Sequence, residues 1–298
     1  MSPPSFGSNI KNELLASLIW AKMGKGERKA FAKAHGTSLG AIVEHGAGSA
    51  EFDYTALTEQ AGKKNFSEYL SRHLGSRFSV MLAPSFPGIL PSPDGKGHES
   101  RARTSKGYKK LDVNYSTPEL GLGLGVSIKT INAVDPSSKR YTKNFTRVDA
   151  ELRAEAADYH ERQPYATMVA VIFLPFAACD DASDRDPSSF GAAVQLFRNR
   201  AGRDEPADSH MLFEGVFVGL YDTHPGAFGD TVFVDVMAPP PWRGRPRNVL
   251  SFDEVVAGIV SIYDKRNWPE FEWEGVVPRG ASAEDAALPD EGNDDEVD

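Results

Sequence analysis

The sequence predicts a mixed α/β (α+β) fold in which a mixed central sheet is flanked by helices, and three observations lead to that prediction. Tyr165–Pro175 is a nearly continuous apolar run of strand length, which is typical of a central strand buried on both faces. Thr146–Gln163 places apolar residues at helical spacing directly before that strand. Tyr108–Thr130 predicts two short strands joined by a glycine-rich turn. With one more helix and strand upstream, these segments predict an αβββαβ core over residues 56–175.

The first half of the chain is expected to supply N-terminal helices and the start of this core. Residues 8–46 should be mostly helical, because their leucines and isoleucines fall on one face. Leu57–Leu74 has helical apolar spacing and predicts the first core helix. Arg77–Pro84 predicts a strand that ends at a proline, which cannot continue a ladder. Ser85–Gly107 is rich in Pro, Gly and Ser and predicts a long loop.

The second half of the chain continues the alternation of helices and strands. The helix over 146–163 is expected to begin with a capping box formed by Thr146 and Asp149 and to stop before Pro164. The later elements expected are a helix at Phe190–Asn199, strands at Met211–Tyr221 and Asp230–Met237, and a last helix opened by a capping box at Ser251–Glu254. No repeat or linker precedes residue 277, so we expect a single domain over residues 1–277, followed by a disordered acidic tail over 278–298.

Composition narrows the class of protein. No apolar run reaches the ~20 residues that a membrane-spanning helix needs, and the N-terminus lacks the pattern of a secretory signal. The single cysteine, Cys179, excludes an internal disulfide framework and a multi-cysteine zinc site. We therefore expect a cytoplasmic protein with no membrane partner.

The charge is distributed unevenly along the chain. The net charge is −9, and residues 278–298 hold eight acids and one base, a net of −7, which leaves −9 − (−7) = −2 for the rest. Residues 96–147 hold eleven Lys or Arg and four acids, a local net of +7. A basic segment of this kind predicts contact with phosphates, although a solvated loop would have the same composition.

The glycine-rich strand pair carries the candidate chemistry. Asp112 lies in the first predicted strand, and Ser127 and Lys129 lie two residues apart in the second, so their side chains point to one face. An acid and a lysine placed in this way can share a divalent metal and a scissile phosphate. This arrangement, within an αβββαβ order of elements, resembles the PD-(D/E)xK nuclease superfamily, whose fold is restriction-endonuclease-like. Ser127 stands where that family has its second acid.

The resemblance implies Mg²⁺ or Mn²⁺ as cofactor and a second acid supplied from elsewhere. Mg²⁺ takes near-octahedral oxygen coordination, usually from one or two carboxylates with waters and substrate phosphate, so Asp112 alone would hold it poorly. In the family a displaced acid can come from a neighbouring helix, and the candidates here are Glu151, Glu155 and Glu68. The alternative for Glu151 and Glu155 is an exposed helix face, with Arg147 paired to Glu151 at i, i+4.

Candidate nucleic-acid contacts come from the basic segment and from a later loop. The loop after residue 238 combines three prolines with several arginines, which predicts a stiff basic surface. The side chains expected to contact phosphate are Lys106, Lys109, Lys110, Arg140, Lys143, Arg147, Arg243 and Arg245.

Taken with the resemblance, these residues predict a Mg²⁺-dependent nuclease that cleaves phosphodiester bonds, of DNA in the first instance. The resemblance also implies a setting in microbial restriction or antiviral defence, with a protein partner in a larger complex. The alternative from another class is a degenerate, non-cleaving member of the fold that binds nucleic acid or a partner protein. A Ser–Lys hydrolase dyad at Ser127 and Lys129 is a further alternative, but the sequence lacks the context of an acyl-transfer site.

Overall fold

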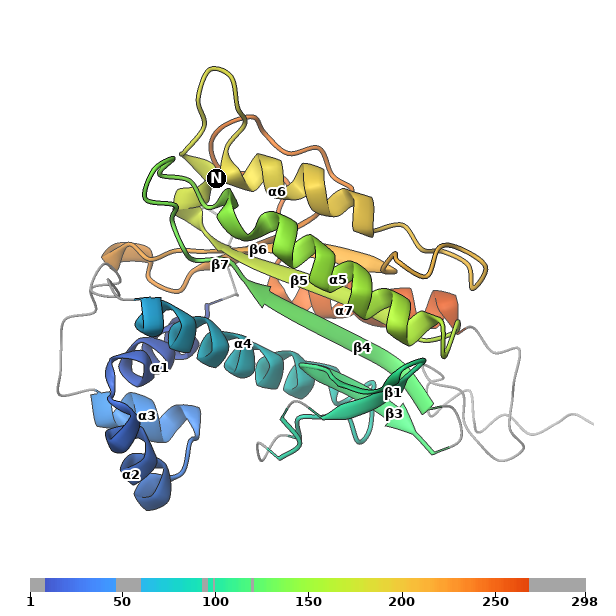
Figure 1. Ribbon diagram of the computed structural model, residues 1–298, viewed down its shortest axis with the longest axis horizontal. Helices are drawn as coiled ribbons and strands as arrows, with labels where there is room; N and C mark the ends of the chain where they lie inside the picture. The colour runs from blue at the N-terminus through green and yellow to red at the C-terminus, as the bar shows by residue number, and fades with distance from the viewer. Residues whose placement is uncertain (1–8, 47–59, 93–95, 99, 119–120, 268–298) are drawn as a thin grey trace, which may run out of the picture. The chain divides into compact units, whose positions relative to one another are not determined.

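A five-stranded mixed sheet forms the centre of the computed structural model, which describes residues 9–46, 60–92, 96–98, 100–118 and 121–267 (Figure 1). The strands lie in the order β3-β4-β5-β6-β7. The inner pairs β4–β5 and β5–β6 are parallel, and the outer pairs β3–β4 and β6–β7 are antiparallel. The strand bounds are β3 Val113–Thr117, β4 Gly121–Thr130, β5 Thr167–Pro175, β6 Gly215–Tyr221 and β7 Thr231–Asp235. All nine residues of β5 are buried, as the apolar run predicts.

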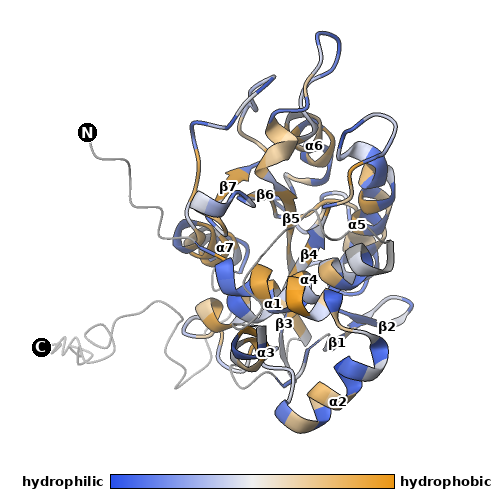
Figure 2. Cartoon of the chain, turned by 90° about the vertical axis from the view of Figure 1, so that its left-hand side faces the viewer, coloured by the Kyte–Doolittle hydropathy of each residue, from blue (hydrophilic) through white to orange (hydrophobic). Residues whose placement is uncertain are grey.

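Helices cover both faces of this sheet (Figure 2). Helices α5 (Phe145–His160) and α6 (Ser189–Phe197) share one core with the sheet. Helices α4 (Gln60–Leu82) and α7 (Phe252–Arg266) share the core on the opposite face with α1 (Lys11–Lys22). The predicted fold class, a mixed sheet flanked by helices, is therefore confirmed.

The N-terminal helices are also confirmed. They comprise α1, α2 (Lys25–His35) and α3 (Leu39–Gly46). Their apolar residues build a small core of their own, in which Trp20 meets the ring of Tyr69 on α4 with the ring centroids 4.3 Å apart.

The strand predicted at Arg77–Pro84 is wrong, because α4 continues without a break to Leu82. Phe66, Leu70, Leu74, Phe78 and Leu82 are each buried and recur every four residues, so one apolar stripe extends over the whole helix. Gly75 does not end the helix. A side chain there would come within 3.1 Å of the Asp112 carbonyl oxygen, so the glycine allows α4 to pass close to the chain at Asp112.

The segment between α4 and β3 differs from the prediction as well. The loop predicted over Ser85–Gly107 ends earlier than expected, because from Arg101 on the chain forms a separate two-stranded antiparallel sheet, β1 (Arg101–Thr104) and β2 (Gly107–Lys110), which we call the ribbon. Tyr108–Lys110 belong to this ribbon, so Asp112 lies between two strands. Gly121–Gly125 are part of β4 itself, so the predicted glycine-rich turn is strand.

The later elements match the prediction in kind and order. The capping box of α7 is present, because the Ser251 N–H donates to Glu254 Oε2 (2.6 Å) and the Glu254 N–H donates to Ser251 Oγ (3.2 Å). The capping box predicted for α5 is wrong: the N-cap is Asn144 without a side-chain bond, and Asp149 instead accepts from Arg200.

Two further expectations concern membrane-spanning helices and the domain boundary. Within them, no helix is long and apolar enough to cross a membrane. Contacts group residues 1–266 into one unit and 267–298 into another. The predicted boundary at residue 277 and the acidic segment 278–298 lie outside the described residues.

Candidate active site

Asp112 occupies the point where the chain leaves the ribbon and enters the central sheet. The last pair of the β3–β4 ladder is Val113 with Val126. Directly beyond it, Asp112 Oδ2 accepts a hydrogen bond of 2.7 Å from the backbone N–H of Ile128. The carboxylate therefore takes the place of a strand partner and is fixed against the C-terminal part of β4.

Glu155 of α5 joins Ser127 and Lys129 on one face of β4. Its Oε2 accepts from Ser127 Oγ at 3.0 Å and from Lys129 Nζ at 3.1 Å. Ser127 is fully buried, while the side chains of Glu155 and Lys129 are 13% and 22% exposed. Helix α5 thus places a carboxylate beside position 127 of the strand, and Ser127 is one of its hydrogen-bond donors.

The charges of Asp112 and Glu155 act on the same neighbours. Burial is the largest influence on the pKa of Lys129 and acts to lower it. Attraction from Glu155 and Asp112, with the hydrogen bond to Glu155 and a smaller attraction from Glu151, outweighs burial, so the pKa is raised. The pKa of Tyr159 is also raised, first by burial and then by the negative charge of nearby acids, Glu155 and Asp112 among them. The two carboxylates and the ammonium group therefore form one electrostatic unit around residues 127–129 of β4, and Lys129 carries a positive charge at neutral pH.

The oxygen donors of this site decide whether it could hold Mg²⁺. Among the described residues, no group of three or more His, Cys, Asp or Glu side chains is placed to hold a metal ion. The site instead offers two carboxylates, Asp112 and Glu155, and oxygen is the donor that Mg²⁺ prefers. Because Mg²⁺ commonly uses one or two carboxylates and completes its coordination with waters and substrate phosphate, these residues fit that ion. They do not fit a closed structural site.

The other two candidate acids lie outside this cluster. Glu151, one turn before Glu155, pairs with Arg147 at 2.6 Å, which is the exposed helix-face arrangement given as the alternative. Glu68 is 62% exposed and pairs with Lys64. Of the three helix acids considered, only Glu155 contacts the motif residues.

The predicted basic contacts are divided between two regions, and most are held by local acids or carbonyls. Lys106 and Lys109 of the ribbon both pair with Asp158, which is 4% exposed. Five others make local contacts near the N-terminal end of α5 or in the loop after β7: Lys143 with Asp135, Arg147 with Glu151, Arg140 with Pro187 and Asp186, Arg243 with Ala182, and Arg245 with Asp222. The ribbon is connected to Asp112 by a single residue, Leu111, and is therefore the basic region nearest to Asp112 along the chain.

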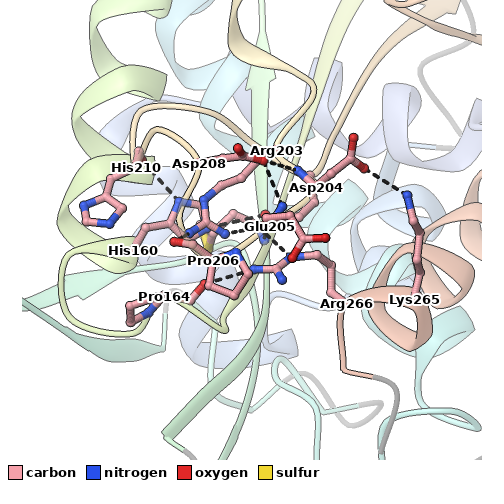
Figure 3. A network of polar contacts seen from close by, with 12 residues as sticks. His160, Pro164, Arg203, Asp204, Glu205, Pro206, Asp208, His210, Lys265 and Arg266 are labelled. Atoms are coloured by element: carbon pink, nitrogen blue, oxygen red, sulfur yellow. Dashed lines mark hydrogen bonds and ion pairs between the residues drawn. The ribbon is translucent and has the colours of Figure 1, made fainter.

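A second polar cluster surrounds Glu214, which is 1% exposed, and Figure 3 shows several of its members, among them Arg203 and Arg266. Its carboxylate meets Arg203 at 2.8 Å, Arg266 at 3.4 Å and His160 at 3.4 Å. Burial acts to raise the pKa of Glu214, but bonds from His160, Arg203 and the Met168 N–H outweigh it, so the pKa is lowered. The cluster ties the end of α7 to the starts of β5 and β6, which is a structural role.

Two side chains that help to build the site were not singled out from sequence, Tyr159 and Asp158. Tyr159 Oη donates to the Lys109 carbonyl at 3.0 Å, and Asp158 holds the ribbon lysines, so α5 fixes the ribbon beside Asp112. The i, i+4 spacing of Glu155 and Tyr159 was the available signal, because it places both on one helix face.

The chain has no significant match among protein-family models, curated proteins or solved structures.

Proposed function

We propose that this protein is a Mg²⁺-dependent nuclease that cleaves phosphodiester bonds of nucleic acid, with DNA as the first substrate to test. One observation carries the proposal: Asp112, Lys129 and Glu155, from three different segments, converge on residues 127–129 of β4. Two carboxylates and a lysine around one stretch of strand support a metal–phosphate site, although the strand itself carries a serine.

Each residue has a role that follows from its contacts. When bound, Mg²⁺ would polarise the scissile phosphate and lower the pKa of an attacking water. Lys129 stays protonated and supplies positive charge where negative charge develops on the phosphate. Asp112 is fixed by the Ile128 N–H, and Glu155 is oriented by Ser127, so both carboxylates are held in place before substrate arrives.

Cleavage of plasmid and oligonucleotide DNA with Mg²⁺ or Mn²⁺ tests the proposal. Asp112→Asn, Glu155→Gln and Lys129→Met should each lower the rate by ~10²-fold or more, which is typical when one preorganised electrostatic group is removed. Glu151→Gln and Glu68→Gln are matched controls that remove the same charge from exposed acids that do not contact the motif residues, and they should lose far less activity than Glu155→Gln.

The outcomes separate nuclease from non-cleaving subunit. If the parent cleaves neither DNA nor RNA with either metal, the catalytic proposal is wrong. The alternative of a degenerate member of the fold would then stand, and the contact between Glu155 and Lys129 would be a structural ion pair. If Glu151→Gln is as damaging as Glu155→Gln, the assignment of the second acid is wrong.

A further inference from the structure

The ribbon presents one face whose side chains share a chemistry. Arg101 pairs with Lys110 and Arg103 with Tyr108 in its register. Residues directly opposite in an antiparallel pair point to the same side. Arg101, Arg103, Tyr108 and Lys110 therefore lie on one face, and all four are exposed, whereas Ala102 and Thr104 on the other face are buried. The exposed face combines three cations and one aromatic ring.

The ribbon is held firmly, although isolated two-stranded hairpins are at best marginally stable in water. Asp158 of α5 binds Lys106 at 2.9 Å and also binds Lys109. The backbone N–H of Ser105 donates to the Asp158 carbonyl at 2.9 Å. Two lysines and the turn of the ribbon thus bind α5. The exposed face of the ribbon is therefore held in a fixed position.

The aromatic residue of this face is unusually accessible. Tyr108 is 63% exposed, and the guanidinium of Arg103 lies 5.7 Å from the centre of its ring. Arginine matches phosphate geometry through planar, bidentate hydrogen bonds. An exposed ring stacks on a nucleic-acid base only where that base is unstacked, as in a single strand. Cations and an accessible ring together are the chemistry of a single-strand binding surface.

The face is also close to the candidate active site along the chain. Lys110 precedes Asp112 by two residues, which span at most ~7 Å when extended. A strand lying on the ribbon would therefore lead directly to the carboxylates.

We infer that the exposed face of the ribbon binds a single-stranded segment of nucleic acid, with Tyr108 stacked on a base and Arg101, Arg103 and Lys110 contacting phosphates. The inference deepens the proposed function and rests on it for the identity of the ligand class. It makes a single strand, rather than an intact duplex, the substrate segment that enters the site.

Fluorescence anisotropy of a labelled single-stranded oligonucleotide, with the full chain in EDTA across a salt series, tests this binding. Tyr108→Leu should weaken single-strand binding about 5- to 150-fold, the range expected for loss of one stacked base, with an unchanged salt slope. Tyr108→Trp should bind like the parent, because the ring face is kept. Arg101→Gln with Arg103→Gln should reduce the salt slope by about 1.4, at ~0.7 per phosphate contact on single strands.

Matched controls identify the face rather than surface charge or aromaticity in general. Tyr165 is 64% exposed and lies outside the ribbon, so Tyr165→Leu should bind like the parent. Lys265 is 73% exposed and paired with Asp204, so Lys265→Gln should leave the salt slope unchanged. Equal loss in Tyr108→Leu and Tyr165→Leu would overturn the inference, as would tighter binding of duplex than of single strand.

The test separates this inference from the proposed function. If the parent cleaves DNA and Tyr108→Leu binds single strands as tightly as the parent, strand binding by the ribbon is wrong and the nuclease proposal is unaffected. If the parent cleaves nothing, Tyr108→Leu loses binding and Tyr108→Trp keeps it, the nuclease proposal is wrong and strand binding by the ribbon is supported. Thermal unfolding of every variant confirms that the fold is retained.

Discussion

Lys129→Met should separate metal binding from catalysis. In the parent, Lys129 Nζ lies 3.1 Å from Glu155 Oε2 and offsets its negative charge. A metal ion approaching the carboxylates meets that positive charge, so removing it favours the metal. Glu155→Gln keeps the shape of the side chain but removes the charge, so it should weaken metal binding and catalysis together.

The size of the effect follows from the geometry. Unit charges 3.1 Å apart interact by ~1.3 kcal/mol in bulk water and ~5 kcal/mol at an effective dielectric constant of 20. Both side chains are mostly buried, so the bulk-water figure is a lower bound for this pair. Lys129→Met should therefore tighten Mn²⁺ binding about tenfold or more, since ~1.4 kcal/mol corresponds to a factor of ten. The same variant should lose ~10²-fold or more in cleavage rate.

Titration calorimetry with Mn²⁺ measures the affinities, and thermal unfolding checks that each variant is folded. Glu151→Gln serves as the charge control, because that acid pairs with Arg147 and does not contact Lys129. Metal affinity that falls in Lys129→Met as much as in Glu155→Gln would refute the reasoning, since the lysine could not then be a competitor of the metal.

Three further predictions concern single side chains. Ser127→Ala removes one hydrogen bond to Glu155 and should cost ~1 kcal/mol of stability with a mild loss of cleavage; a loss as large as that of Glu155→Gln would show a direct role for the hydroxyl. Glu214→Gln leaves Arg203 buried without its carboxylate and should cost ~3–5 kcal/mol, or ~6–20 °C in melting temperature, whereas Asp204→Asn, an exposed control, should change little. Because the pKa of Glu214 is lowered from its ordinary 4.5, this contribution is present above pH 4.5 and is lost as the pH falls through the folded pKa, so urea unfolding at pH 7 and pH 3 should show the difference between parent and variant shrinking in acid. Cys179 is buried with its pKa raised to about 12 by burial and the neighbouring acids, so a thiol reagent at pH 8 should label it only after unfolding in guanidinium, and rapid labelling of the folded protein would contradict this.

The pattern of the sequence predicted the fold class well where periodicity was unambiguous. β5 is recognisable as a buried strand because it is apolar throughout. α7 is recognisable as a helix because its capping box precedes an apolar stripe. Arg77–Pro84 failed because Phe78, Val80 and Leu82 fit an alternating strand as well as a helix, and only packing against the sheet selects the helix. The ribbon was missed because its strands have four residues each, which is too short for a clear period.

The candidate site was predictable in its strand residues and only in part elsewhere. Asp112 and Lys129 follow from local spacing. Glu151 and Glu155 are four residues apart and lie on the same side of α5, so the choice between them depends on the position of α5 along its axis relative to β4. The pattern of apolar residues does not define that position to within one turn. Composition alone overstates the free positive charge of the basic segment. Lys106 and Lys109 count toward its net charge, but Asp158, which lies outside the segment on α5, binds both.

Helix α5 carries both Glu155, which reaches the site, and Asp158, which holds the ribbon, less than one turn apart. The ribbon and the second carboxylate are thereby attached to one rigid element. Local opening that lifts α5 from the sheet would withdraw Glu155 from Lys129 and release the ribbon in the same event. Amide hydrogens of the ribbon and of the C-terminal half of α5 should therefore exchange as one cooperative unit, and the protein would lose its strand-binding face and its metal ligand together rather than in sequence.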